Sequence, residues 1–577
     1  MMGLMRRALL FALLTLAPGA ASAIWTNIGP FGGDARSLAS DSAGNTVFVL
    51  NPRTGVFRSA FGGPWTLVFD ALQRGVVPTR VAVDSQNGRA YIGATTGLYR
   101  SDDSGLTWKL VTSDPIVDVA AAGDRVIAST PQVLERSPNA GGTWTNINSP
   151  GSDNFNTVSR ILIDPRSVER VLAINQGKLF LSGDLGNTWD QLPVTNIVAA
   201  IFADTIYAGG PAGLFSCETT CNQIGSDPVI DVTYFQGLIH VALPDGVLRF
   251  VLPRWERLIS GFPNATPRSL LGTPRELLVG TTAGVYSTTD DVNWVNRSDG
   301  LSNVHITAMA LAGGSLFAGT LEQSVMRRSA DVWTTADNGL ARHAPALPLP
   351  RALASDGSTI YAAFLADGLF RSTDQGRSWN DITAGLPSRD VLDVAADPGI
   401  VVAATGAGLV KSNDLGTTWQ PFKNYPGITA DIVAVRGSTV MAAKATTVYA
   451  STDGGNTWQS GDLPSPVVRI AIAGSHLYAT TDTDVFVNNG GGWSHAALPS
   501  SIVHAITASG SYVFVSLASG IFRSSDGVSW TLVPQSDTLP PDITSLAVDA
   551  TTLYAGTNGG SIFATSLVPP RLRAVRH

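Results

Sequence analysis

The chain has 577 residues, of which 44% are hydrophobic and 14% are charged, with 59 glycines and a formal net charge of -7. A chain of this length is too long to fold around one hydrophobic core, so we expect two domains or one long repeat array. The composition excludes long disordered tracts, and the acidic balance disfavours a nucleic-acid partner, which normally needs a basic face.

The N-terminus has the pattern of a secretory signal peptide. Arg6 and Arg7 precede an apolar run over residues 8–16, and the small residues Ala21, Ser22 and Ala23 follow it. The apolar run is shorter than the roughly 20 residues that a membrane-spanning helix needs, which disfavours the alternative of a retained anchor. We therefore predict cleavage after Ala23, a secreted or periplasmic location and no membrane insertion.

Tryptophan marks an internal repeat along the rest of the chain. The 13 tryptophans recur with a period of about forty residues, which is the spacing of β-propeller blades. Each period contains four short segments rich in Val, Ile, Tyr and Thr, such as residues 79–84, 90–95, 97–101 and the segment that begins at Trp108. Gly, Asn and Asp separate these segments, so the pattern predicts four strands in each repeat.

The third segment of the repeat gives the number of blades. It runs from "GVFRS" at residue 55 to "SIFAT" at residue 561, with seven copies in each half of the chain. Because a fourteen-bladed ring would be too wide, we predict an all-β fold of tandem seven-bladed β-propellers with four-stranded blades. The expected domains are a signal peptide (1–23), a first propeller (24–294), a second propeller (295–568) and a basic C-terminal tail (569–577).

An N-terminal strand is expected to take part in ring closure. Trp25 precedes every blade, whereas the last blade has no Trp-led strand after it. Two arrangements satisfy this pattern. Either Trp25 closes blade fourteen, or it closes blade seven and Trp294 closes blade fourteen.

The long interval between Trp189 and Trp255 contains a repeat without tryptophan and both cysteines of the chain, Cys217 and Cys221. Half of a metal site is one interpretation, but no second Cys or His cluster accompanies the pair. In an oxidising compartment a disulfide is favoured. We predict no metal site and no cofactor.

The turn before the fourth strand carries the pattern Ser-x-Asp-x-Gly-x-Thr-Trp, as in "STDGGNTW" at residues 451–458. It resembles the Asp-box, or BNR repeat, of sialidases, sortilin-type receptors, two-propeller xyloglucanases and photosystem II assembly factor-like propellers. The third position of the box is held by Asp103, Asn139, Asp184, Asp374, Asp414, Asp453 and Asp526.

We interpret the Asp-boxes as structural parts. Asp and Ser side chains can accept or donate hydrogen bonds within a tight turn, and Trp can cover the gap between blades. A calcium loop would need several spaced acids, whereas each box offers one carboxylate. The resemblance implies that the boxes lie on the face opposite the usual ligand site.

Propeller ligands gather at the mouth of the central channel, where the innermost strands begin. The residue just before the apolar core of each first segment is charged in six of the first seven blades, and it predicts a ligand site formed by Arg36, Arg80, Asp118, Arg160, Asp231 and Arg268. Four arginines facing two aspartates indicate a carboxylate or sugar clamp. The alternative is a set of polar strand ends that pair with one another.

The catalytic residues of the enzymes that the repeat resembles are not recognisable here. The Arg-Ile-Pro signature of sialidases is absent, and the loop that corresponds to the first-blade motif of two-propeller xyloglucanases is "NPRTGVFR", with Pro52 where the catalytic Asp would stand. We therefore predict no catalytic residue and a binding or assembly scaffold for a protein or carbohydrate ligand. The alternative is a glycoside hydrolase or sialidase-like enzyme that works in the cleft between the propellers.

Overall fold

The computed structural model describes residues 25–567 except 152–157, 252–253, 259, 263–264, 303, 322–323, 341–348, 500 and 535–538. These residues form fourteen four-stranded antiparallel sheets and one short helix, α1 (Ala71–Arg74). The predicted signal peptide and basic tail lie outside the described residues. The first seven sheets are β2–β5 (37–70), β6–β9 (78–112), β10–β13 (118–147), β14–β17 (158–191), β18–β21 (199–225), β22–β25 (231–257) and β26–β29 (267–296). The others are β30–β33 (306–335), β34–β37 (350–381), β38–β41 (391–421), β42–β45 (432–462), β46–β49 (469–495), β50–β53 (503–532), and β54–β56 (543–566) joined by β1 (Thr26–Gly29).

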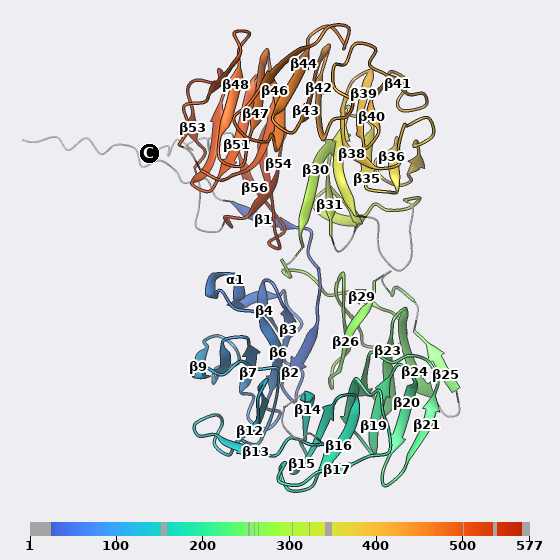
Figure 1. The fold of residues 1–577 in the computed structure, drawn as a ribbon. Coiled ribbons are helices and arrows are strands. Elements are labelled where there is room, and N and C mark those ends of the chain that lie inside the picture. The colour runs from blue at the N-terminus through green and yellow to red at the C-terminus, as the bar shows by residue number, and fades with distance from the viewer. Residues whose placement is uncertain are drawn as a thin grey trace, which may run out of the picture.

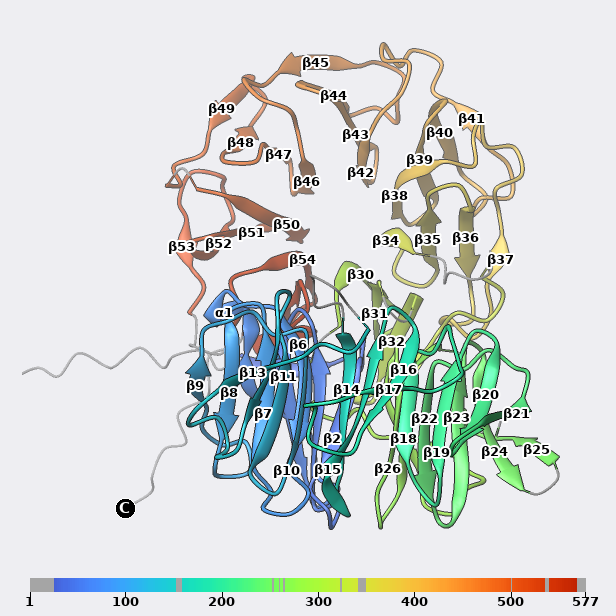
Figure 2. The ribbon, with the colours of Figure 1, turned by 60° about the horizontal axis from the view of Figure 1, so that its bottom comes forward.

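Each set of seven sheets closes into a ring, so the predicted tandem seven-bladed propellers are confirmed. In the first ring, Val47 and Phe57 of blade one share a core cluster with Leu278 of blade seven. In the second ring, Leu316 of the eighth sheet packs with Ala547 of the last. The two rings fill the lower and upper halves of Figure 1, and Figure 2 shows the strands of the second ring arranged around a common centre.

The N-terminal strand completes the last blade of the second ring, which decides between the two predicted arrangements. β1 pairs with β56 (Ile562–Ser566), and Figure 1 shows the blue strand beside the red one. Trp25 is 2% exposed, and its Nε1 donates a hydrogen bond of 3.2 Å to Pro534 O. Blade seven is instead completed by β29 (Val295–Asn296), the strand that follows Trp294. Residues 26–29, expected in the first propeller, therefore belong to a sheet of the second.

This pairing makes the chain cross between the rings twice. The segment from β1 to β2 and the segment from β29 to β30 run side by side, because Gly32 and Ser302 form a parallel bridge. The Gly32 amide donates to Leu301 O at 2.9 Å. Two chain segments, hydrogen-bonded to each other, therefore connect the propellers.

Burial within each blade follows from stacking. The second strands β3 (Thr46–Asn51) and β31 (Ser315–Thr320) are buried along their whole length because neighbouring blades cover both faces. They accordingly read as apolar runs rather than as an alternating pattern. The two residues of the outer strand β17 (Asp190–Gln191) are exposed.

The Asp-boxes form the hairpins between third and fourth strands, and their side chains bond within the turn. Asp453 Oδ1 accepts the amides of Asn456 and Thr457 at 2.9 Å, and Ser451 Oγ accepts the Gly455 amide at 2.8 Å. The remaining boxes repeat these contacts at Asp103, Asn139, Asp184, Asp374, Asp414 and Asp526. Each box therefore satisfies its own turn amides, as a structural part should.

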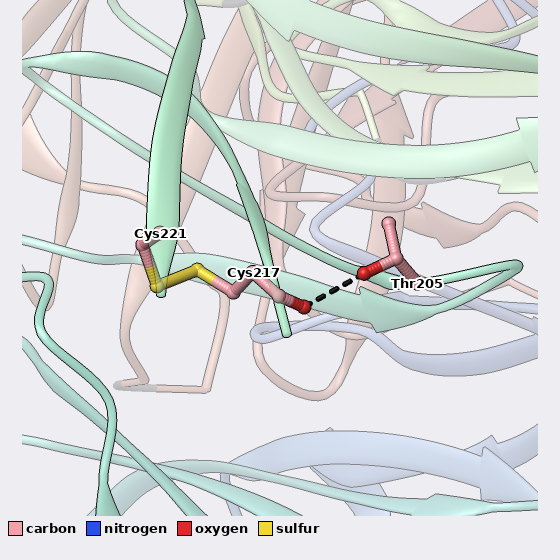
Figure 3. Close-up of a disulfide and its surroundings, with 3 residues drawn as sticks. All are labelled: Thr205, Cys217 and Cys221. Carbon is pink, nitrogen blue, oxygen red and sulfur yellow. Dashed lines mark hydrogen bonds between the residues drawn. A yellow bond between two sulfur atoms is a disulfide. The ribbon is translucent and has the colours of Figure 1, made fainter. Parts of the chain in front are cut away.

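Cys217 and Cys221 form a disulfide across the hairpin between β20 (Gly213–Cys217) and β21 (Cys221–Gly225). Figure 3 shows the bond beside Thr205, whose hydroxyl donates to Cys217 O at 2.7 Å. This is the blade without an Asp-box or tryptophan. The covalent bond thus holds the turn that side-chain hydrogen bonds hold in the blades with an Asp-box.

Candidate functional site

The candidate site lies at the end of the first propeller where the innermost strands begin. In an antiparallel four-stranded blade, this end also carries the hairpin between the second and third strands, whereas the Asp-boxes lie at the opposite end. The innermost strands are β2 (Ser37–Ser40), β6 (Pro78–Val83), β10 (Asp118–Ala122), β14 (Val158–Asp164), β18 (Ala199–Phe202), β22 (Asp231–Phe235) and β26 (Pro267–Gly272).

Four of the six predicted site residues occupy equivalent positions on their strands. Each of them pairs with an equivalent residue on the second strand of its own blade; the four residues are Arg80, Asp118, Arg160 and Asp231. Arg36 and Arg268 lie one residue earlier, and Ser37 and Ser269 take the equivalent positions in blades one and seven. In β26 the ladder skips Arg268, just as it skips Thr79 in β6 and Ser159 in β14, so Arg268 corresponds to Thr79 and not to Arg80.

The four equivalent residues form an inner group of alternating charge. Arg80 Nε lies 3.2 Å from Asp118 Oδ1, and Arg160 Nη2 lies 3.7 Å from Asp231 Oδ1. The aspartate side chains are 3% and 8% exposed, so this group is nearly buried. Its two positive and two negative charges compensate each other.

Burial and neighbouring charges shift the ionisation of the inner group. Burial, with the nearby Arg160 guanidinium, lowers the pKa of Arg80 to about 10 against the opposing effect of Asp118 and Asp231. Burial also raises the pKa of the Asp118 carboxyl, although Arg80 and Arg160 oppose that shift.

The inner aspartates also bind the backbone of neighbouring blades. Asp118 Oδ2 accepts the Ile161 amide at 2.6 Å, and Asp231 Oδ2 accepts the Leu270 amide at 2.9 Å. Each carboxylate therefore joins its own blade to the next one. The alternative interpretation, strand ends that pair with one another, describes this inner group well.

Arg36 and Arg268 form an outer group around Asp34, an acid outside the predicted ligand site. Asp34 Oδ2 lies 2.6 Å from Arg36 Nε, and Asp34 Oδ1 lies 3.3 Å from Arg268 Nε. The two arginine side chains are 58% and 42% exposed, in contrast to the inner group. One carboxylate thus faces two guanidinium groups, which leaves one positive charge uncompensated within the outer group.

Polar atoms without partners lie among these groups. Within the described residues, no hydrogen-bond partner is found for the buried atoms Ser37 Oγ, Ser269 Oγ and Arg160 Nε. Both serines stand at the equivalent position that the charged residues occupy in other blades. Buried polar atoms are normally hydrogen-bonded, so these three atoms depart from that rule.

The loop that would carry an enzyme's acid instead contacts the second propeller. It joins β3 to β4 (Gly55–Ala60), and Arg53 Nη1 lies 2.7 Å from His305 Nε2. A β-carbon at Gly559, in the hairpin between β55 (Thr552–Thr557) and β56, would lie 3.3 Å from Thr54 Cγ2. Pro52 is therefore part of a loop that packs between the rings.

The equivalent end of the second ring is less charged. Asp393 stands at the start of its innermost strand, and its Oδ2 accepts the Val433 amide at 2.9 Å. Burial raises the pKa of Asp393 to about 6, although backbone amides, Arg351 and Arg469 oppose the shift. The Arg469 Nε donates to His504 O at 3.2 Å.

Two further observations concern the described residues as a whole. No group of three or more His, Cys, Asp and Glu side chains among them has an arrangement that could hold a metal ion. None of their helices is both long and apolar enough to cross a membrane.

Comparison with known proteins identifies the fold. No protein-family model and no curated protein sequence matches the chain. Among solved structures, it is similar to a GH74 enzyme of Niastella koreensis, with a TM-score of 0.70, 17% identity and coverage of 94% of this chain and 99% of that one. It is also similar to the GH74 xyloglucanase of Xanthomonas campestris, with a TM-score of 0.68, 16% identity and coverage of 94% and 99%. PorZ, a surface component of the type-IX secretion system of Porphyromonas gingivalis, matches with a TM-score of 0.58, 14% identity and coverage of 94% and 87%. At these identities the likeness establishes the tandem-propeller fold alone.

Proposed function

We propose that the protein is a secreted or periplasmic scaffold that binds a carboxylate-bearing glycan at the mouth of the first propeller. The observation that carries the proposal is the outer group, in which Arg36 and Arg268 share one carboxylate and remain about half exposed. Planar guanidinium groups bind carboxylates through paired hydrogen bonds, so these two side chains suit a uronate group.

The inner group supports the site without needing to touch the ligand. Its charges compensate each other, and its aspartates hold the blades through backbone amides. The Ser37 and Ser269 hydroxyls are buried at the same end of the channel, so the ligand would contact the exposed arginines and not these serines. A glycan is favoured over a protein partner because similar tandem-propeller structures include a xyloglucanase.

Binding of a defined probe tests this proposal. We expect an oligogalacturonate to bind the wild-type protein with an affinity that falls as salt is added, because the contact is ionic. Replacing both arginines by alanine (Arg36→Ala, Arg268→Ala) should weaken binding at least 10-fold, since hydrogen bonds to charged groups contribute about 1.5–3 kcal/mol each. Arg89→Ala is the matched control, because Arg89 is an ion-paired arginine at the opposite end of the same ring. Equal loss in the control, or unchanged binding in the double variant, would refute the proposal.

A glycoside hydrolase with a site between the rings is the second candidate, and the similarity to GH74 enzymes favours it. Against it, Pro52 stands at the position that the resemblance assigns to the acid, and Arg53 is engaged with His305. Incubation with a panel of neutral and acidic polysaccharides and sialosides separates the two functions. Release of reducing ends from any of them would replace the scaffold by the enzyme.

A further inference from the structure

A separate hollow of about 390 Å³ opens on the second propeller where its first and last blades meet. It is lined by the turn at Gly313 and Gly314, by Asp549 and Tyr554 of the last blade, and by Arg328 and Asp331 of the first. Both turns join a first strand to a second strand. The hollow therefore lies at the Asp-box end of the ring, away from the channel mouths considered above.

The hollow lies at a junction that has no Asp-box. The hairpin here joins β32 (Ser324–Ser329) to β33 (Val332–Thr335). Arg328 takes the position of the box serine in this hairpin. It pairs with Leu316 of the second strand, and the box serine Ser101 pairs with the equivalent residue, Ala90, in its own blade. From this position to the tryptophan the hairpin has six residues, Arg328 to Trp333, whereas a full box such as Ser101 to Trp108 has eight. The glycine of the box is among the missing residues.

In several other blades that glycine covers an aromatic ring of the preceding blade. A β-carbon at Gly105 would lie 2.3 Å from Phe48 Cε1, and one at Gly376 would lie 2.7 Å from Phe317 Cε1. In the last blade, Tyr554 is the residue equivalent to Phe48. Tyr554 pairs with Ala564 of the third strand, and Phe48 pairs with the equivalent residue, Arg58, in the first blade. With no box glycine above it, Tyr554 is only partly buried and lines the hollow.

The polar groups of the hollow are held in place but remain accessible. Tyr554 Oη donates to Asp549 Oδ2 at 3.0 Å, and Asp549 Oδ1 accepts the Thr552 amide at 2.7 Å. Arg328 Nη2 lies 2.8 Å from Asp331 Oδ1, whose side chain is 86% exposed. Arg328 Nε has no partner among the described residues. The hollow thus presents an aromatic ring, two fixed carboxylates and a guanidinium group.

We propose that this hollow binds a sugar residue. Two carboxylates against one guanidinium group disfavour an anion, whereas fixed acceptors and donors beside an aromatic ring suit a ligand with several hydroxyls and an apolar ring face. The volume lies within the range of about 300–1,000 Å³ that small-molecule sites occupy. This inference does not depend on the proposed function, because it concerns the other propeller and a ligand without a required negative charge.

Saturation-transfer NMR with D-glucose, D-galactose, D-xylose and D-glucosamine tests the inference on the full chain. We expect at least one of these probes to bind with a Kd in the millimolar range, about 1–20 mM. A preference for glucosamine would show that the excess carboxylate attracts the ammonium group, and equal binding of glucose would show that hydroxyls suffice. Either result supports the site, and absence of binding by all four probes to the wild-type protein would overturn it.

Two variants and a matched control place the binding in this hollow. Arg328→Ser installs the serine of the complete boxes and should weaken binding at least 10-fold, and Tyr554→Phe should weaken it several-fold by releasing Asp549. Tyr478→Phe is the control, because Tyr478 holds the same strand position but is covered by the box glycine Gly527. Wild-type affinity in Arg328→Ser, or equal loss in Tyr478→Phe, would overturn the inference. Thermal unfolding of each variant verifies that the ring is intact.

Discussion

Two adjacent glycines of one Asp-box allow a sharp test of how the boxes stabilise the rings. Both Gly454 and Gly455 have positive φ, at 75° and 87°. A β-carbon at Gly454 would meet nothing within 4 Å, whereas one at Gly455 would lie 2.1 Å from Phe422 Cδ1 of the preceding blade. Gly454→Ala and Gly455→Ala therefore add the same methyl group to similar backbone, and only one of the two creates an overlap.

The expected costs differ accordingly. Gly454→Ala should cost about 1 kcal/mol or less, because other boxes accept Ser104, Leu185 and Leu415 at this position with φ of 56–60°. Gly455→Ala should cost about 2–4 kcal/mol, from the strained φ and an overpacked core together. At roughly 2 °C per kcal/mol for a domain of this size, the second ring's Tm should fall by about 4–8 °C in that variant.

Differential scanning calorimetry measures both effects in the full chain. The account predicts a clear downward shift of the second-ring transition for Gly455→Ala and a shift of about 2 °C or less for Gly454→Ala. Equal shifts for the two variants would show that φ alone sets the cost. That result would refute the conclusion that box glycines are required for packing against the neighbouring blade.

Three further predictions address ring closure, pH and the disulfide. Trp25→Ala should destabilise the second propeller by about 3–5 kcal/mol, because it empties a buried site; calorimetry should show an unchanged first-ring transition, and an equal shift of both would contradict closure by β1. The pKa of Asp393 is raised from 3.8 to about 6, so the folded protein favours the protonated carboxyl. The stability that this protonated group contributes should be fully present below about pH 4 and should be lost as the pH rises through 6. Asp393→Asn should make the unfolding midpoint less dependent on pH between about pH 4 and 6. A pH profile identical to that of the wild-type protein would refute this assignment. Replacing Cys217 and Cys221 by serine should lower the free energy of unfolding by about 2 kcal/mol, because so short a loop restrains the unfolded chain only modestly. A loss above about 5 kcal/mol, measured by chemical denaturation, would show that the disulfide has a larger role.

The architecture could be predicted from the sequence because each blade repeats the same local signals. The box hairpins, with glycine at a positive φ and Asp453 accepting turn amides, are encoded within eight residues. Pairing of β1 with β56 was not predictable in the same way. It joins Thr26 to Ala564 across the whole chain, and nothing local in the Trp25 segment distinguishes one open blade from another.

The candidate site was harder to predict because it depends on register. β6, β14 and β26 share a bulge that skips one residue, and Arg268 is the skipped residue in β26, whereas Arg80 follows the skipped residue in β6. Such a bulge leaves little mark in an alternating pattern. Asp34 lies in the crossing between the rings, outside the repeat, so comparison of blades could not reveal it. The spacing in Asp34-Ala35-Arg36 was the available signal, since residues two apart in an extended chain point to the same side.

The proposed function turns on whether Arg36 and Arg268 are the ligand-binding groups, and a crystal structure of the protein with tri-galacturonate tests this most directly. The account predicts a uronate carboxylate within hydrogen-bond distance of both guanidinium groups, at the end of the first propeller where β2 and β26 begin. A trisaccharide whose carboxylates contact neither arginine would contradict it.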